Sequence, residues 1–224
     1  KTPTVIKDIR QLVAIKDFDA LAIAMPDHWH TPAAILGVTN GKHVYVEKPC
    51  GYNPGEGEML VAASKKYKPL IQMGNQRRSY PSLQEAVKRV KNGLIGNPYF
   101  VKTWYTNKRK PIGIGKKIAV PPTLDFNLWQ GPAPRRDFQD NLVHYNWHWF
   151  WDFGCGDIGN QGVHQMDVAR WMIPNATLPK SVFSLGGRFG YSDQAQTPNT
   201  QIAVFDYGET QLIFEVRGLK TEKY

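Results

Sequence analysis

Three short apolar segments separated by helix-like stretches constrain the fold of this chain more than any other feature. The apolar segments span residues 19–25, 44–46 and 70–73, and helices are predicted at 5–15, 31–39 and 56–66. Strands that alternate with helices over short connections are parallel and joined by right-handed crossovers. The continuous apolar run at 19–25 also predicts strands that are covered on both faces. The first part of the chain is therefore expected to form an α/β layer.

The second part of the chain predicts a different arrangement, because its last strands follow one another without helices between them. Helices are expected at 82–91 and 157–173, and strands at 99–106, 181–189, 200–206 and 210–217. The last three strands favour an antiparallel sheet. Residues 107–150 form a long segment rich in aromatic side chains, and this composition predicts an ordered, functional loop.

The composition argues against two classes of partner. The 224 residues carry a net charge of +9, which suits an anionic ligand, but the basic residues are scattered and accompany no nucleic-acid-binding motif. We interpret these groups as solvated surface, and among them Arg77 and Arg78 are the best placed to meet a phosphate or a sugar, because they follow a predicted strand. No apolar run is long enough to span a bilayer. We therefore predict neither a nucleic-acid nor a membrane partner.

The two cysteines, Cys50 and Cys155, are too few for a disulfide framework and lack the paired spacing of a zinc site. No metal site is therefore predicted. Cysteine usage and the absence of a recognisable targeting segment leave the compartment open between cytoplasm and periplasm.

The predicted strand at 44–46 ends in an acid, a base and a proline. Pro49 has no N–H group and ends the hydrogen-bond ladder directly after Glu47 and Lys48. Ligands of open α/β sheets bind at the carboxyl ends of the strands, so Lys48 is placed to contact a substrate. The alternative interpretation is a solvated Glu-Lys pair at a strand end, and the pattern alone favours neither.

The predicted helix at 157–173 has two different faces. One face carries small and apolar residues, namely Ile158, Gly162, Met166, Ala169 and Ile173. The opposite face carries Asp157, Asn160, His164, Asp167 and Trp171. Polar faces are usually solvated, but these groups follow a glycine-rich entry, so we interpret the face as the lining of a pocket. The aromatic run from Trp147 to Phe153 directly precedes the helix and predicts a wall of that pocket.

A G-x-G-x-x-G sequence at 154–159 matches the pattern of a dinucleotide-binding loop. It lacks the buried strand that should precede such a loop and the acidic residue that should follow about 20 residues later. We therefore do not assign a dinucleotide site to these glycines.

Several of these motifs together resemble the Gfo/Idh/MocA family, the glucose-fructose oxidoreductase, inositol dehydrogenase and rhizopine-catabolism enzymes that use NAD or NADP. The motifs are Asp27-x-x-His30, Glu47-Lys48-Pro49, Gln-Gly-Pro-Ala-Pro-Arg at 130–135 and Asn-Gln-Gly-Val-His-Gln-Met-Asp at 160–167. They occur in the family's order and cover nearly the whole chain.

The resemblance implies a fold class of α/β plus α+β. It predicts the C-terminal part of a parallel Rossmann sheet, followed by an α+β domain with a mostly antiparallel open sheet. The expected domains are 1–76, a partial dinucleotide-binding domain on the nicotinamide side, and 77–224, a domain for substrate binding and oligomerisation whose sheet stops before it looks finished.

The resemblance also implies roles for particular residues. Lys48 matches the family's catalytic lysine, and His164, with Asn160 beside it, matches the histidine of the substrate site. The predicted cofactor-binding residues are Pro26, Asp27, His30, Glu47, Lys48 and Asn75. The predicted substrate-binding residues are Arg77, Trp147, Asp157, Asn160 and His164.

Two features differ from the family's pattern. The glycine-rich cofactor fingerprint would precede residue 1, so this chain is expected to hold only the nicotinamide side of the site and to be inactive alone. Asn160 lies where many members carry an aspartate, and an amide cannot accept a proton as a carboxylate does. Acid–base chemistry would then rest on Lys48 and His164, and the missing negative charge would favour a lower pKa for Lys48.

The predicted function is an NAD(P)-dependent oxidoreductase that transfers a hydride from a sugar, a polyol or a related carbohydrate, as a homodimer or homotetramer. Two alternatives stay open. One is a lyase or glycosidase that uses NAD for a transient oxidation of a sugar, and the other is a carbohydrate-binding fragment without catalysis.

Overall fold

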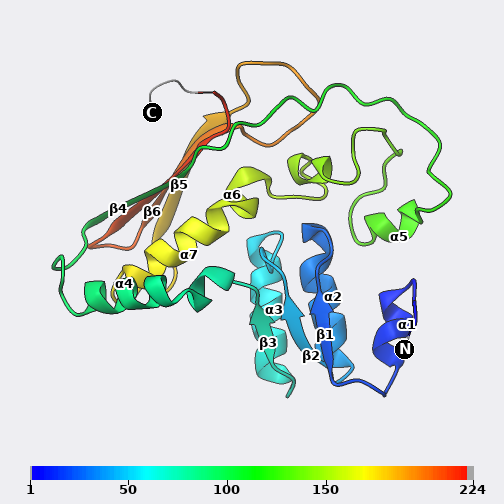
Figure 1. The fold of residues 1–224 in the computed structure, drawn as a ribbon, viewed down its shortest axis with the longest axis horizontal. Helices are drawn as coiled ribbons and strands as arrows, with labels where there is room; N and C mark the ends of the chain where they lie inside the picture. Colours follow the sequence, from blue (N-terminus) through cyan, green and yellow to red (C-terminus); the bar gives the residue numbers. More distant parts are fainter. Residues whose placement is uncertain (1, 221–224) are drawn as a thin grey trace. The chain divides into compact units, whose positions relative to one another are not determined.

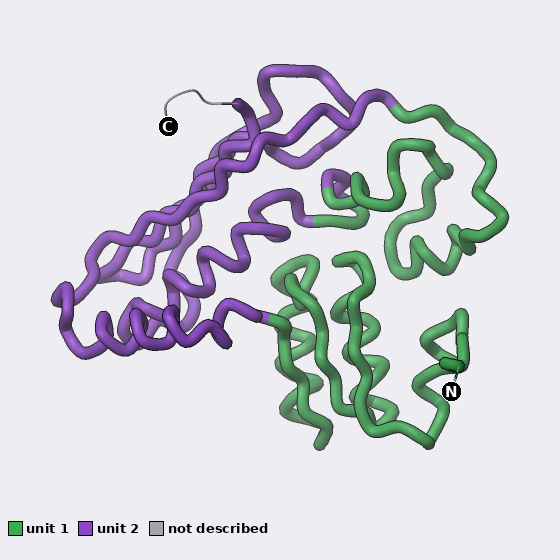
Figure 2. Tube along the Cα trace, viewed as in Figure 1, with its two compact units in different colours: residues 1–74, 115–148, 152–154 green, residues 75–114, 149–151, 155–224 purple. Residues whose placement is uncertain are grey.

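The computed structural model describes residues 2–220, which form two compact units. The first unit comprises residues 1–74, 115–148 and 152–154, and the second comprises 75–114, 149–151 and 155–224 (Figure 2). The aromatic segment therefore groups mainly with the N-terminal residues. The division into domains at 1–76 and 77–224 stays a prediction.

The first unit contains a sheet of three parallel strands in the order β1-β2-β3, as predicted (Figure 1). The strands are β1 (Ala20–Ile23), β2 (His43–Val46) and β3 (Ile71–Met73). Helices α1 (Ile9–Ala14), α2 (Asp27–Thr39) and α3 (Pro54–Lys66) precede or connect them. The alternation of strands and helices along the chain thus produces the parallel pairing that it predicts.

Helix α2 begins at Asp27, whereas the sequence predicted a start at Thr31 with Pro32 in the first turn. Pro32 lies instead in the second turn, where its missing N–H group removes one helical hydrogen bond. The earlier start places the Asp27 carboxylate in the first turn, and a negative charge there is favourable next to the helix macrodipole. The predicted Asp27-x-x-His30 turn is therefore the first turn of the helix itself.

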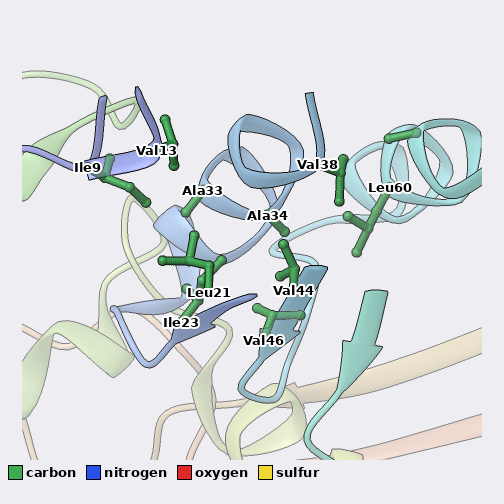
Figure 3. Packing of buried hydrophobic residues seen from close by; sticks show 11 residues of the cluster. Ile9, Val13, Leu21, Ile23, Ala33, Ala34, Val38, Val44, Val46 and Leu60 are labelled. Atoms are coloured by element: carbon green, nitrogen blue, oxygen red, sulfur yellow. The ribbon is translucent and has the colours of Figure 1, made fainter. Parts of the chain in front are cut away.

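The sheet of the first unit has one covered face. Leu21, Ile23, Val44 and Val46 are buried against the helices (Figure 3). The alternate residues of β1 and β2 are exposed, so the prediction of strands covered on both faces is wrong for the described residues. The apolar run at 19–25 gave the wrong prediction because the exposed positions of β1 are alanines. Alanine is apolar, so the strand shows no alternation of polar and apolar residues although only one face is covered.

The long aromatic segment is ordered, as predicted. Within the first unit it contains α5 (Phe126–Gln130), whose entry is capped by the carboxylate of Asp125, which accepts a hydrogen bond of 2.9 Å from the amide of Leu128. The ring centroid of Phe126 lies 5.7 Å from that of Trp129 and 5.0 Å from that of Phe138. This aromatic cluster replaces regular secondary structure as the source of order.

The second unit contains a sheet of four strands in the order β4-β7-β6-β5. Its elements are the 3-10 helix η1 (Gln76–Ser79), α4 (Pro81–Lys91), β4 (Phe100–Tyr105), the 3-10 helix η2 (Asn146–Trp149), which straddles the boundary with the first unit, α6 (Gly156–Asn160), α7 (Gly162–Met172), β5 (Ser181–Gly187), β6 (Thr200–Asp206) and β7 (Gln211–Arg217). The last three strands are antiparallel, as predicted, and β4 adds to the sheet parallel to β7. The sheet is thus mostly antiparallel.

The helix predicted at 157–173 is two helices, because the chain breaks between α6 and α7 at Gln161. Gly159 and Gly162 flank the break, and glycine is among the weakest helix formers. Gly162 also allows a close approach to the sheet, since a β-carbon there would lie 2.7 Å from the ring of Phe214. The face expected to be apolar does pack inward at Ala169 and Ile173.

Candidate active site

The first candidate site lies where β1 and β2 of the first unit end. The amide of Glu47 donates to the carbonyl of Ile23 at 2.9 Å, and this is the last bond of that ladder. Lys48 follows directly, and both charged residues are half-buried. The predicted position of the pair at a strand's carboxyl end is therefore correct, and a purely solvated pair is not what the structure has.

Lys48 experiences opposing electrostatic influences. Burial is the largest and lowers the pKa of its ammonium group, while the carboxylates of Asp27 and then Glu47 oppose that change. The net direction is a lowered pKa, which increases the fraction of neutral amine at a given pH. The neutral amine is the form of a lysine that can accept a proton.

Glu47 is held on the exposed side of the sheet by its neighbours. The hydroxyl of Tyr45 donates to a carboxylate oxygen of Glu47 at 3.2 Å. A β-carbon on Gly74 would lie 2.5 Å from that hydroxyl and 3.1 Å from the Glu47 carboxylate, so only glycine leaves room for both side chains. The hydroxyl of Tyr45 and the carboxylate of Glu47 thereby lie against the backbone of Gly74 at the ends of β2 and β3.

Helix α2 contacts the turn that follows Lys48. The Nδ1 atom of His30 lies 2.7 Å from the carbonyl oxygen of Pro49, and the hydroxyl of Thr31 donates to the carbonyl of Cys50 at 2.5 Å. Pro26 is the residue before the helix. These contacts bring the predicted residues Asp27, His30 and Lys48 together within the first unit.

The second candidate site belongs to the second unit and contains a buried ion pair. Asp157 is 1% exposed, and its carboxylate accepts a hydrogen bond of 2.8 Å from a terminal nitrogen of Arg109. The Arg109 guanidinium also stacks over the ring of Trp149, 4.8 Å from its centroid. Burial raises the pKa of the Asp157 carboxyl, and Arg109 and then Arg188 oppose the rise. Asp157 thus has a partner inside the chain, and its role toward a substrate stays a prediction.

Asn160 and His164 are both buried, Asn160 at the end of α6 and His164 in α7. The polar face of the predicted helix is therefore not solvated. Its remaining members are engaged by Arg78, which pairs with Asp167 through two hydrogen bonds of 2.8 and 2.7 Å and stacks over Trp171.

The remaining predicted residues are Asn75, Arg77 and Trp147. Asn75 and Arg77 belong to the second unit, Asn75 directly after the sheet residue Gly74 and Arg77 within η1. Trp147 belongs to the first unit, where its indole donates to the carbonyl of His144 at 2.9 Å and stacks on His148. Convergence of Lys48 and His164, which belong to different units, stays a prediction.

Sequence reasoning missed two residues that organise the first unit, His28 and Trp29. Nε2 of His28 lies 2.9 Å from the carbonyl oxygen of Trp129, and the indole of Trp29 donates to the same carbonyl at 3.1 Å. Gly131 has a φ of +50°, and a β-carbon on it would lie 2.2 Å from the Trp29 ring. The signal in the sequence was the Gln-Gly-Pro run, whose glycine is needed for this close approach.

The G-x-G-x-x-G sequence is not a dinucleotide loop in this structure. Gly154 and Gly156 face the protein's own atoms, since β-carbons there would lie 2.5 Å from the backbone of His148 and 2.7 Å from the side chain of Thr197. The helix that follows, α6, has only five residues, and no strand directly precedes it. The glycines serve packing.

The described residues contain neither a cluster of metal-binding side chains nor a membrane-spanning helix. Within residues 2–220 no group of three or more histidine, cysteine or acidic side chains is arranged to hold a metal ion. No helix in the same range is long and apolar enough to cross a membrane.

A parallel α/β layer followed by a helix-backed mixed sheet, with an acid and a lysine at the end of a strand, is the arrangement of a class of nicotinamide-dependent oxidoreductases. Residues 2–75 match the model described as the NAD-binding Rossmann fold of this oxidoreductase family, and residues 81–185 match its C-terminal alpha/beta domain. The chain belongs to the Gfo/Idh/MocA family. The predicted family, fold class and cofactor class, NAD or NADP, are confirmed.

Individual members of the family are similar to this chain at low sequence identity and over part of their length. The chain is 23% identical to the rhizopine catabolism protein MocA of Rhizobium meliloti over 72% of this chain and 40% of that protein. It is 25% identical to the myo-inositol 2-dehydrogenase of Thermotoga maritima over 62% of this chain and 37% of that protein.

Among solved structures, the fold resembles the WlbA dehydrogenase of Bordetella pertussis in complex with NADH and UDP-GlcNAcA. The TM-score is 0.71 at 20% identity, over 96% of this chain and 57% of that one. The chain thus spans less than two thirds of each of these proteins.

Proposed function

We propose that this chain is part of an NAD(P)-dependent dehydrogenase that removes a hydride from a hydroxyl-bearing carbon of a sugar, a polyol or a related carbohydrate. The observation that carries the proposal is the half-buried Lys48 with a lowered pKa at the end of β2, within the segment that matches the NAD-binding fold. Relatives named as a myo-inositol dehydrogenase and as a dehydrogenase bound to UDP-GlcNAcA support a carbohydrate as the substrate.

In this proposal the cofactor's nicotinamide half binds at the carboxyl ends of the first unit's strands. Pro26, Asp27, His30, Glu47 and Lys48 surround that edge, and Asn75 follows it. NAD or NADP supplies the hydride acceptor. The Asp27 carboxylate at the start of α2 disfavours the pyrophosphate at that helix, so these residues fit the nicotinamide half only.

The substrate half of the site is assigned to Arg77, Trp147, Asp157, Asn160 and His164. Buried amide and imidazole groups can hold hydroxyl groups by hydrogen bonds, and an indole can pack against the apolar face of a sugar ring. Lys48 would accept the hydroxyl proton, and His164 with Asn160 would position the carbohydrate. Asp157 would act through its pair with Arg109, as part of the buried wall.

The proposal is tested by a panel of inositols, hexoses and nucleotide sugars, offered with NAD⁺ or NADP⁺ to a polypeptide that carries these residues and binds the dinucleotide. The expected result is reduced cofactor formed in proportion to an oxidised carbohydrate. Cleavage of the sugar without net cofactor reduction would favour a lyase or glycosidase, an outcome that Asn160 makes worth testing because it cannot accept a proton. Carbohydrate binding that is insensitive to cofactor would contradict both enzymatic proposals.

We also propose that the second unit forms the contact of a homo-oligomer through the open face of its sheet. Strand register places Trp104, Glu215, Ile202 and Leu185 in one row across the four strands, and Phe183 follows on the same face. Trp104, Phe183 and Leu185 are each more than half exposed. Several large exposed apolar side chains on one sheet face suit contact with a second copy.

The double substitution Trp104→Glu and Phe183→Glu is therefore expected to convert the oligomer to monomer, because it places charges on this apolar face at both edge strands of the sheet, β4 and β5. Light scattering coupled to size-exclusion chromatography measures the mass. Leu178→Glu is the control, since Leu178 is an even more exposed apolar residue that lies outside the sheet. An unchanged mass in the double variant would contradict the assignment of this face.

A further inference from the structure

Two consecutive residues of α2 bond to two consecutive residues that follow Lys48. His30 contacts the carbonyl of Pro49 at 2.7 Å, and Thr31 donates to the carbonyl of Cys50 at 2.5 Å. The two donor residues are only 2% and 1% exposed, so water does not compete for these bonds. The turn after Lys48 is thus attached to the helix at two adjacent points.

The chemistry of the first bond defines the state of the His30 ring. A carbonyl oxygen only accepts, so Nδ1 must carry the hydrogen. The other ring nitrogen, Nε2, is buried and has no hydrogen-bond partner among the described residues. The polar contact of this imidazole with the described chain is therefore the one to Pro49.

The same helix also supplies the opposite charge with the stronger influence on Lys48. Asp27 lies one turn before His30 and Thr31, on the same side of α2, because residues three and four apart share a helix face. Its carboxylate acts on Lys48 more strongly than that of Glu47 does. One face of the first two turns of α2 thus contacts Lys48 electrostatically and its following peptides by hydrogen bonds.

We infer that His30 and Thr31 are positioning residues that hold the turn after Lys48 and thereby keep the lysine amine partly withdrawn from water. The inference assigns His30 a role toward the protein's own backbone, in addition to the proposed proximity to cofactor. Only the consequence for catalysis by Lys48 rests on the proposed function. The contacts themselves and their effect on the amine exist in the chain without cofactor or substrate.

The test measures the reactivity of Lys48 in the chain without ligands. Competitive labelling with an amine-reactive reagent from pH 7 to 11, read by peptide mass spectrometry, gives the titration midpoint of Lys48, with the exposed Lys65 as internal reference. Each unit by which the pKa of an amine rises lowers its neutral fraction about tenfold at pH values below the midpoint. The wild-type midpoint of Lys48 is expected below the ordinary value of a lysine.

Two matched pairs of variants separate the hydrogen bond from simple packing. His30→Leu and Thr31→Val remove the donors and are expected to raise the Lys48 midpoint, because a freed turn lets the ammonium reach water. His30→Asn keeps a nitrogen donor near Nδ1 and Thr31→Ser keeps the hydroxyl, so both should retain more of the wild-type midpoint. Circular dichroism checks that each variant is folded.

If folded Thr31→Val and His30→Leu both keep the wild-type midpoint, the inference is wrong. If His30→Leu does not fold, the Thr31 pair alone decides, since valine and threonine have nearly the same shape. The proposed function fails separately, through unchanged hydride transfer after loss of the Lys48 amine. The labelling result does not depend on that outcome.

Discussion

Replacement of Lys48 by methionine is expected to slow hydride transfer about 100- to 10,000-fold, the usual contribution of a positioned general base. Hydride departure from a hydroxyl-bearing carbon requires that the hydroxyl proton leave as well, and Lys48 is the half-buried amine at the strand end. Methionine has a similar length but no amine, so the fold should be kept. Single-turnover measurement of reduced-cofactor formation is the appropriate assay, because steady-state rates can report product release.

Lys65→Met is the control, since Lys65 is an exposed lysine of α3. Its single-turnover rate should equal that of the wild type. A wild-type rate in Lys48→Met would reduce Lys48 to a strand-end charge and make His164 the leading candidate for the base. Cofactor affinity, measured by fluorescence titration, should change little in Lys48→Met, because the nicotinamide contact does not depend on the amine alone.

Replacement of Arg109 by methionine is expected to lower the free energy of unfolding by about 3–5 kcal/mol, the usual result of removing one partner of a buried ion pair. Asp157 is 1% exposed, and the Arg109 side chain is 17% exposed, so the remaining carboxylate would be left in a poorly solvated position. Urea denaturation followed by tryptophan fluorescence measures the change. Lys117→Met, which removes an exposed ion pair with Asp137, should cost less than about 1 kcal/mol.

The pH dependence of this loss tests its cause. Burial raises the pKa of Asp157, and removal of Arg109 removes the main opposing influence. A carboxyl whose pKa is raised on folding destabilises the folded state above that pKa, and the penalty is relieved as pH falls toward the unfolded value of about 3.9. The deficit of Arg109→Met should therefore be smaller at pH 5 than at pH 7, and Asp157→Asn in the same background should recover part of it. A deficit that does not vary with pH would indicate lost packing on Trp149 instead.

Local pattern was sufficient for much of the first unit. Its strands and helices are short, regular and close in sequence, so hydrophobic periodicity and turn residues specify the parallel order and the position of Lys48 after β2. The sequence also predicted that the aromatic segment is ordered, because its many large rings can bury one another. The same pattern could not show whether one or both faces of this sheet are covered, since alanine occurs on buried and on exposed faces alike.

Contacts between distant segments account for what local pattern missed. The partner of Asp157 is 48 residues away in the chain, and the carbonyl of Trp129 lies 101 residues from His28. The break at Gln161 and the buried state of Asn160 and His164 depend on packing against the sheet, where Gly162 meets the Phe214 ring. Periodicity reports which side chains share a face, but whether that face meets water, a sheet or a charge depends on segments brought beside it by folding.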